Sequence, residues 1–531
     1  MKIKCLGAVR TVTGSCFQLD NSSGGLILLD CGLFQGGRQT ELRNFNTDLY
    51  KPSEVKAVVI THAHMDHSGL VPRLVKAGYR GPVYATVATC ELLKILWQDA
   101  AHIQSQEAVW KSRKNKRQGQ RTVEPLYEEE DALLANTLLS PLPSNQAVEI
   151  QPGVFLTLLA AGHILGAASA YLVASCQGRT ERILFSGDLG RQGQLLIPDA
   201  QIPPESDMIF METTYGNRRH KDLDTSVDEL ISVIHQARKS GGKVLIPAFA
   251  VERTQEILFL LSTLWHEGKI PRDIPIILDS PLATATSGVY VKNQHLFDQK
   301  SRELIRNGFS PLTMSALTVT KSMEDSQKIN QIQGSAIIVA GSGMANAGRI
   351  LHHLKHNLWR DNCHVVFVGF QAQGTTGRRL VDGAEAVKLF RESVVVNAKI
   401  HTIGGFSGHA DQAELVEWLR PQIHQGLKVV LVHGEESGTV AFQKHLKELF
   451  PELETAIPYW REVIEVEGPG LKPEEVPEPE PMMAVSWSQS FQERLERIAA
   501  IMADRPVPLG PSELANLENL LNQAEEMILR P

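Results

Sequence analysis

The most constraining feature of this chain is the segment THAHMDHSG at 61–69, which places three histidines and one aspartate within six positions. It follows an apolar run at 55–60 that predicts a buried strand. A loop at the end of a strand therefore carries imidazole and carboxylate groups, and Zn²⁺ binds both readily. His62 and His64 alternate, so both can point to one side of an extended segment, and the spacing indicates more than one metal ion. The alternative is a histidine-rich surface loop.

The length and composition of the chain predict a large protein with more than one domain. Its 531 residues are 43% hydrophobic and 21% charged, which is enough for a sizeable core. The formal net charge is −7, so any binding of nucleic acid must depend on local basic patches.

The cysteines and the apolar segments predict a cytoplasmic protein without a membrane partner. Six cysteines are scattered without a CxxC pair, which is typical of buried, reduced thiols. The first residues lead into a strand-like pattern and lack the apolar region of a signal peptide. No apolar stretch approaches the length that spans a bilayer.

The order of apolar runs predicts two kinds of α/β organisation. Residues 1–85 and 147–188 consist of short strands and glycine-rich turns, with a mainly helical segment at 88–135 between them. From 209 to 392 strands alternate with helices, which is typical of a parallel sheet. A later strand at 428–434 carries a histidine near its end.

A strongly basic run, KSRKNKRQGQR, occupies residues 111–121, and an acidic segment follows at 128–131. A basic run beside an acidic one is typical of a solvated surface. The alternative is a contact with nucleic acid.

The C-terminal part differs in composition from the rest. Residues 466–486 are rich in proline and glutamate and predict a semi-extended linker. Residues 487–531 predict a helical tail with amphipathic helices at 488–503 and 512–529, the second capped by Ser512. Two short helices bury little surface on their own. We therefore expect the tail to dock on the body of the chain, on a second copy as a homodimer interface, or on another partner.

Four further polar residues stand in glycine-rich turns or at a strand end. His163, Asp188 and His409 are flanked by glycines, where backbone can approach a ligand closely. His433 closes its strand. Taken one at a time, a histidine at a strand end is more often structural.

Taken together, these residues resemble the β-CASP branch of the metallo-β-lactamase superfamily, the nucleic-acid-processing nucleases. The resemblance covers roughly residues 1–465, and the motifs fall in the family's order. They are Asp30, the HxHxDH segment at 62–67, His163 and Asp188, followed by Glu212 as motif A, His409 as motif B and His433 as motif C.

The resemblance implies an α/β fold in which an αββα sandwich carries an inserted β-CASP α/β domain. The sandwich is expected from residues 1–208 and 393–465, with the insert at 209–392. The active site is expected in the cleft between them, which an extended single strand of RNA can pass through.

The resemblance also implies a site for two Zn²⁺ ions per chain, with Mn²⁺ as the alternative ion. Asp188 would bridge the ions, and Asp30 would orient a histidine ligand through its other ring nitrogen. The other ligands would be His62, His64 and His163 for the first ion and Asp66, His67 and His433 for the second.

The implied activity is hydrolysis of RNA phosphodiester bonds by a hydroxide that two zinc ions activate, in RNA processing or decay. Asp66, Glu212 and His409 form the expected catalytic set, with His409 as general acid and Glu212 raising its pKa. The alternative for Glu212 is a helix cap or a salt bridge. Members of the branch that process RNA carry histidine at motif C, so His433 favours RNA over DNA.

Contacts with the substrate are expected on a second set of residues. Ser342 and Gly343 can cradle a phosphate, the alternative being an ordinary glycine-rich turn. Side chains that would contact the RNA backbone, or would simply be solvated, are Arg218, Arg219, His220, Arg378 and Arg379.

Two other functions stay open at this point. A hydrolase of small esters or thioesters would use the same metal core, but an inserted lobe of this size suits a polymer. A catalytically weak scaffold acting through the C-terminal helices is opposed by the intact ligand set. The sequence leaves endonuclease and 5′-exonuclease modes equally open.

Overall fold

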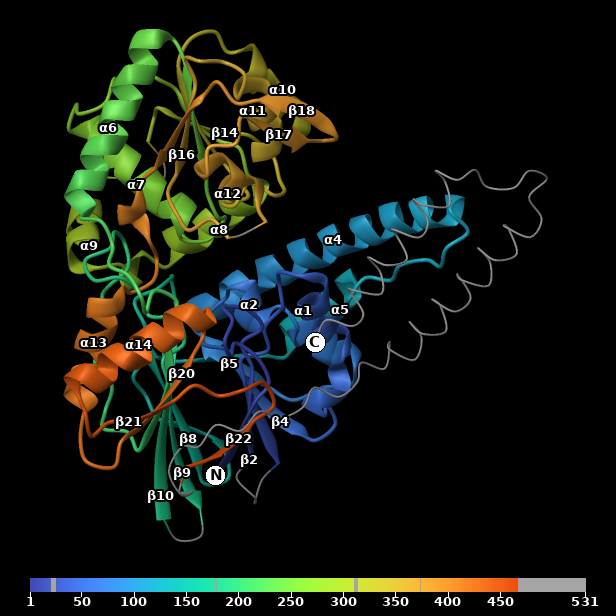
Figure 1. Cartoon of the computed structure of the whole chain (residues 1–531), viewed down its shortest axis with the longest axis vertical. Helices are drawn as coiled ribbons and strands as arrows, with labels where there is room; N and C mark the ends of the chain where they lie inside the picture. Colours follow the sequence, from blue (N-terminus) through green and yellow to red (C-terminus); the bar gives the residue numbers. More distant parts are fainter. Residues whose placement is uncertain (21–24, 177–178, 310–313, 373, 467–531) are drawn as a thin grey trace, which may run out of the picture. The chain divides into compact units, whose positions relative to one another are not determined.

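The computed structural model describes residues 1–20, 25–176, 179–309, 314–372 and 374–466 (Figure 1). The predicted tail helices, and the linker beyond its first residue, lie outside these residues. Five of the six cysteines are described with their side chains, and all five are buried free thiols, as predicted. Within the described residues, no helix has the length and apolar character needed to cross a bilayer.

A mixed sheet of seven strands forms one half of a central sandwich. Across the sheet the strands are β22 (Val463–Glu465), β1 (Lys2–Cys5), β2 (Phe17–Asp20), β3 (Leu26–Leu29), β4 (Val55–Val59), β5 (Val83–Thr86) and β6 (Leu139–Leu142). The apolar run at 55–60 is therefore a strand, as predicted. Strands β3 and β4 run parallel, with Leu29 beside Val59. Their carboxyl ends consequently lead Asp30 and the 61–69 segment to the same edge.

A second sheet of seven strands forms the other half. Its strands are β21 (Glu454–Ala456), β20 (Lys428–Val432), β11 (Met208–Glu212), β10 (Arg179–Phe185), β9 (Ala168–Cys176), β8 (Val154–Ala160) and β7 (Val148–Gln151). Strands β10, β11 and β20 are parallel neighbours, and Glu212 pairs with Val432. Their carboxyl ends carry Asp188, Glu212 and His433 to one edge of this sheet.

The space between the two sheets is filled by apolar side chains from alternate strand positions. Phe17 of β2 lies 5.4 Å from both Phe185 of β10 and Phe210 of β11, measured between ring centroids. Phe185 and Phe210 stack at 4.6 Å. All three rings are buried, and together with Asp30, His67 and His433 they line a small cavity.

Helices cover both outer faces of the sandwich. Side chains of the helices pack in one core with the outward residues of both sheets. This layer order confirms the expected αββα sandwich. The helices beside the first sheet are α1 (Arg38–Leu42), α2 (Met65–Ser68), α3 (Val71–Lys76), α4 (Val87–Arg117) and α5 (Glu129–Thr137), and those beside the second are α13 (Gln412–Leu419) and α14 (Glu436–Leu449).

A third sheet of six parallel strands forms the inserted lobe, which confirms the predicted parallel α/β pattern. Its strands are β14 (Leu317–Val319), β13 (Ile276–Leu278), β15 (Ala336–Ala340), β12 (Lys243–Pro247), β16 (His364–Phe367) and β19 (Lys399–Thr402), and a separate hairpin is formed by β17 (Ala386–Leu389) and β18 (Glu392–Val395). The helices of this lobe are α6 (Leu223–Ser240), α7 (Arg253–His266), α8 (Pro281–Lys292), α9 (Gln299–Arg306), α10 (Met323–Lys328), α11 (Ile350–Asn357) and α12 (Thr376–Val381).

The insertion begins and ends at neighbouring strands of the sandwich, since the chain leaves after β11 and returns at β20. Strand β11 pairs in the second sheet and β19 in the third. The second sheet thus continues beyond residue 208 and the third sheet beyond residue 393. The domain boundaries predicted at these two positions stay predictions. A run of apolar residues shows that a strand exists but does not show which sheet it joins.

Truncation of the ring between the sheets tests this core. We expect Phe210→Ala to lower the apparent free energy of unfolding by about 3–5 kcal/mol, because the cavity cannot fully collapse. Phe155→Ala, at a position that is 41% exposed, is the matched control and should cost less than about 1 kcal/mol. Urea unfolding followed by fluorescence measures both, and equal losses would contradict the assignment of this core.

Candidate metal centre

All seven predicted metal ligands lie together at the edge where the two sandwich sheets end. Their nitrogen and oxygen atoms form two groups, and within each group the atoms lie within 4.8 Å of one another. The first group is His62, His64, His163 and Asp188, and the second is Asp66, His67 and His433.

The local backbone explains how one short segment reaches both groups. His64 is extended, with φ −59° and ψ 148°, and caps the one-turn helix α2. His62 and His64 precede this turn and join the first group. Asp66 and His67 lie within the turn and join the second group.

Ring nitrogens of the histidines face one another at close range. His64 Nδ1 lies 3.1 Å from His62 Nε2 and 3.2 Å from His163 Nε2. In the other group, His67 Nε2 lies 3.1 Å from His433 Nε2. A neutral imidazole carries a proton on only one nitrogen, so several lone pairs converge on the same small spaces. This donor chemistry fits divalent metal ions such as Zn²⁺.

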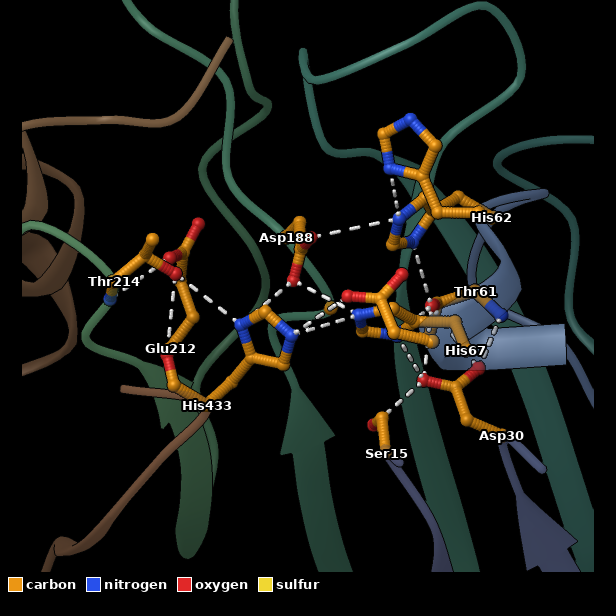
Figure 2. A network of polar contacts seen from close by, with 12 residues as sticks. Ser15, Asp30, Thr61, His62, His67, Asp188, Glu212, Thr214 and His433 are labelled. Atoms are coloured by element: carbon orange, nitrogen blue, oxygen red, sulfur yellow. Dashed lines mark hydrogen bonds and ion pairs between the residues drawn. The ribbon is translucent and has the colours of Figure 1, made fainter. Parts of the chain in front are cut away.

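The carboxylate of Asp188 lies between the two groups (Figure 2). Its Oδ2 is 3.5 Å from His62 Nε2, and its Oδ1 is 3.2 Å from His67 Nε2 and 3.3 Å from His433 Nδ1. Asp188 is 2% exposed, and Oδ1 has no hydrogen-bond donor among the described residues. A buried carboxylate oxygen in this position fits a cation on each side.

Asp30 fixes the ring of His67 from below (Figure 2). Its carboxylate accepts hydrogen bonds from the Thr61 amide at 2.9 Å and the Ser15 hydroxyl at 3.1 Å. The same carboxylate lies 2.7 Å from His67 Nδ1, which leaves Nε2 of that ring facing the ligand group. Asp30 has φ +56°, a left-handed backbone that is strained for a residue with a side chain.

The ring of His163 is oriented by the loop that carries His409. His163 Nδ1 lies 2.7 Å from the carbonyl oxygen of Gly408, so its Nε2 faces His64. A Cβ atom at Gly408 would lie 3.1 Å from Arg253 Nη2 and 3.5 Å from the His163 ring. Glycine at 408 thus permits close packing between His163 and Arg253, the first residue of α7.

Burial keeps most of the clustered histidines in the neutral form that binds metal. It lowers the pKa of His64 to about 4, in spite of the carboxylates of Asp66 and Asp188. Burial likewise holds the pKa of His62 and of His163 well below the ordinary range.

The pKa values of His67 and Asp66 are shifted in opposite directions. Burial alone would lower the pKa of His67, but the carboxylates of Asp188 and Asp30 outweigh it and raise that pKa. Burial alone would raise the pKa of Asp66, but its hydrogen bond to His433 and the charges of His67 and His433 lower it to about 2. The second group therefore keeps a charged carboxylate at neutral pH.

Glu212 and His409 form a third pair beside Asp188. Glu212 is fully buried, and its carboxylate accepts from the amides of Leu189 at 2.6 Å and Thr214 at 3.2 Å. Its Oε1 also lies 3.3 Å from His409 Nδ1. Burial lowers the pKa of His409, but Glu212, helped by Asp188, outweighs burial and raises it to about 9. The His409 side chain is 21% exposed, so a substrate can reach it.

Ser342 and Gly343 follow β15, at the carboxyl edge of the third sheet. The Ser342 hydroxyl accepts from the amides of Asn346 and Ala347, each at 3.2 Å, and so closes its own loop. A Cβ atom at Gly343 would lie 2.7 Å from the Phe249 ring. No contact of either residue with the histidine cluster occurs among the described residues, and their phosphate-binding role stays a prediction.

Two of the predicted backbone-phosphate contacts are engaged elsewhere. Arg378 Nε bonds both carboxylate oxygens of Asp382, at 2.9 and 2.8 Å. His220 Nε2 lies 2.8 Å from the His409 carbonyl oxygen and so braces the His409 loop. Arg378 and Asp382 are four residues apart at the end of α12, so this pair is local. The His220 contact joins segments far apart in sequence and could not be predicted.

A buried polar network missed by the sequence analysis links the inserted lobe to the His163 loop. Tyr290 Oη donates to Glu252 at 2.5 Å and lies 3.4 Å from the amide of Leu165. Burial, with Glu256 nearby, raises the pKa of Glu252 to about 8. Glu252 also has φ +67°. The only sequence signal was the presence of charged residues next to an apolar helix.

Family comparisons agree with this geometry. A family model described as the metallo-beta-lactamase superfamily matches residues 10–224, and a Beta-Casp domain matches residues 254–380. A Zn-dependent metallo-hydrolase RNA specificity domain matches residues 393–458.

Several curated proteins are similar over most of their length. Ribonuclease TTHA0252 of Thermus thermophilus is 40% identical over 446 residues, covering 84% of this chain and 96% of that protein. Proteins named transcription termination factor FttA are 29% identical in Methanocaldococcus jannaschii, covering 88% and 72%, and 30% identical in Methanosarcina mazei, covering 83% and 68%. The chain belongs to the metallo-β-lactamase superfamily, in its β-CASP branch. These matches do not favour a hydrolase of small esters or thioesters.

The support of His67 by Asp30 can be tested through metal affinity. We expect Asp30→Ala to weaken Zn²⁺ binding by about 10–100-fold, because the His67 ring loses the partner that orients it. Competition with a chromophoric chelator measures the affinity. Asp48→Ala, at an exposed position, is the control and should bind as wild type does. An unchanged affinity in Asp30→Ala would contradict this support.

Proposed function

We propose that this protein is a ribonuclease that hydrolyses phosphodiester bonds of single-stranded RNA with two divalent metal ions, Zn²⁺ in first place and Mn²⁺ as the alternative. The observation that carries the proposal is the buried Asp188 carboxylate between two groups of histidines and Asp66. A purely structural cluster of histidines would not explain why a buried carboxylate oxygen, Asp188 Oδ1, lies among them without a hydrogen-bond donor from the described part of the chain.

RNA is favoured as the substrate by two similarities. The region at 393–458, which carries His409 and His433, matches an RNA specificity domain. The relative that matches over 96% of its length is named a ribonuclease. An inserted lobe beside the metal centre also suits a polymer.

The seven clustered residues would hold the metal ions. One ion would be held by His62, His64 and His163, and the other by Asp66, His67 and His433, with Asp188 shared between them. When bound, the ions supply positive charge for the phosphate and lower the pKa of water to near neutrality. Asp30 and the Gly408 carbonyl keep two of the histidine rings in the orientation that binding requires.

Proton transfer falls to His409 in this proposal. Its ring is partly exposed, and Glu212 holds it through Nδ1 and favours its protonated form. The other ring nitrogen is then available to donate a proton to the leaving oxygen of the cleaved bond. Glu212 is a positioning residue because it is fully buried and acts through His409.

A cytoplasmic location and a homodimer through the C-terminal helices stay predictions. Buried free thiols, such as Cys5 and Cys16, support the location.

Digestion of one defined RNA tests the proposal. A single-stranded RNA labelled at its 3′ end would be prepared with either a 5′-monophosphate or a 5′-triphosphate. We expect metal-dependent cleavage by the wild type. The cleavage rates of Asp188→Asn and His433→Ala should fall to that of the metal-depleted enzyme. The control is His445→Ala, on α14, which should cleave as the wild type does.

The pattern of products then separates the two modes. Progressive loss from a 5′-monophosphate end, blocked by triphosphate, would identify an exonuclease. Internal cuts regardless of the 5′ group would identify an endonuclease. If the metal-loaded wild type cleaves neither RNA, the proposal is wrong.

The role of His409 is tested by its removal. We expect His409→Ala to lower kcat by about 10²–10⁴-fold, because the leaving oxygen loses its proton donor. Bound metal, measured by elemental analysis, should stay at the wild-type level. Glu212→Gln should give a smaller loss of kcat. A wild-type kcat in His409→Ala, or a loss of metal that matches the loss of rate, would rule out general acid catalysis by this residue.

A further inference from the structure

The far half of α4 projects from the helix layer and is mostly exposed. With 31 residues, α4 is about 46 Å long. Its buried side chains run from Ala88 to Ala101, and beyond that point only Ala108 is buried. In Figure 1 this end of the helix extends away from the strands. We call residues 109–123, which form its tip and the returning segment, the basic arm.

The basic arm carries concentrated positive charge. Its segment 111–121 has six basic side chains and no acidic one, in a chain whose net charge is −7. Lys111 pairs with Glu107. The other five are exposed and pair with no acidic group among the described residues: Arg113, Lys114, Lys116, Arg117 and Arg121. Such a cluster is suited to neutralising phosphates.

An exposed aromatic ring lies among these charges. Trp110 is 55% exposed, and the Lys114 ammonium lies 5.9 Å from its ring centroid. Val109 beside it is 51% exposed. Single-stranded nucleic acid binds to exposed aromatic faces through base stacking beside cations, which is the combination found here.

The arm is held in shape by its own hydrogen bonds. The Ser112 hydroxyl accepts from the Val123 amide at 2.8 Å and donates to the Val123 carbonyl at 3.1 Å. Asn115 Nδ2 donates to the Arg121 carbonyl at 2.9 Å. Gly119, with φ +67°, provides the turn between them. An arm ordered in advance loses less conformational entropy on binding.

The other end of α4 is hydrogen-bonded to the loop that carries His163. The hydroxyls of Thr86 and Thr89 both donate to the Gly166 carbonyl, at 2.7 and 2.9 Å. Gly166 follows the ligand His163 by three residues in the same loop. The length of α4 corresponds to about 14 nucleotides of stacked strand at 3.4 Å each.

From these observations we propose that the basic arm is a second binding site for single-stranded RNA, outside the cleft, which contacts phosphates through its cations and a base through Trp110. The proposal rests on the proposed ribonuclease function and adds a length preference to it. An RNA too short to reach from the metal centre to the arm gains nothing from the arm. A longer RNA binds at both places.

The test compares RNAs of about 6 and about 40 nucleotides with the full-length protein at several salt concentrations. The arm variant is Arg113→Gln/Lys114→Gln/Lys116→Gln/Arg117→Gln, in which glutamine preserves the helix. We expect its KM for the long RNA to rise about tenfold. The slope of log KM against log salt should fall by about 3. Its kcat and KM for the short RNA should not change.

The control removes the same number of positive charges from exposed positions on other helices. It is Lys239→Gln/Lys300→Gln/Lys444→Gln/Lys447→Gln, and its KM for the long RNA should match wild type. Trp110→Leu should also raise the KM for the long RNA, by about tenfold, and Trp110→Tyr should restore it because the ring can still stack.

Equal KM values of the arm variant and the control for the long RNA would overturn the proposal. Fluorescence anisotropy of the long RNA separates this result from a failure of the proposed function. If wild type binds the RNA and the arm variant binds it about tenfold more weakly, the arm is a binding site whether or not cleavage occurs. Equal affinities would again overturn it.

Discussion

The structure depends on one buried carboxylate, Asp188, and the ring nitrogens that face it from the ends of both sandwich sheets. Its oxygens lie 3.2 Å from His67 and 3.5 Å from His62, away from water. A buried charge requires compensation, and converging imidazole lone pairs require a cation. The arrangement is thus suited to metal ions, and Asp30 and Gly408, the partners of the outer ring nitrogens, orient the rings of His67 and His163.

The inserted lobe is part of this arrangement because it begins and ends at the neighbouring strands β11 and β20. The loop after its last strand carries Gly408, which orients the predicted ligand His163, and His409, the proposed acid. Tyr290 of α8 reaches the amide of Leu165 in the same ligand loop. The placement of the lobe and the geometry of the metal centre are therefore linked through specific hydrogen bonds.

Much of the fold could be predicted from local pattern. The run at 55–60 and the strand–helix alternation after 209 are confirmed, because an apolar run needs burial wherever it lies. Contacts between distant segments could not be predicted. His220, expected to face phosphate, binds the His409 carbonyl, and Glu252 joins a network that reaches Leu165 through Tyr290. The sheet that β11 joins and the sheet that β19 joins could not be predicted either, since strand pairing involves residues far apart in sequence.

By itself, the sequence determined which side chains can bind metal, because residue type and the spacing of His62, His64, Asp66 and His67 are local properties. Only the tertiary structure decided that His163, Asp188 and His433 complete their groups, because these residues come from separate strand ends that meet only when two sheets pack. The tertiary structure also decided the protonation states of these histidines. Imidazoles have similar pKa values in water. In the structure burial lowers the pKa of His64 to about 4, whereas the carboxylate of Glu212 outweighs burial and raises the pKa of His409 to about 9.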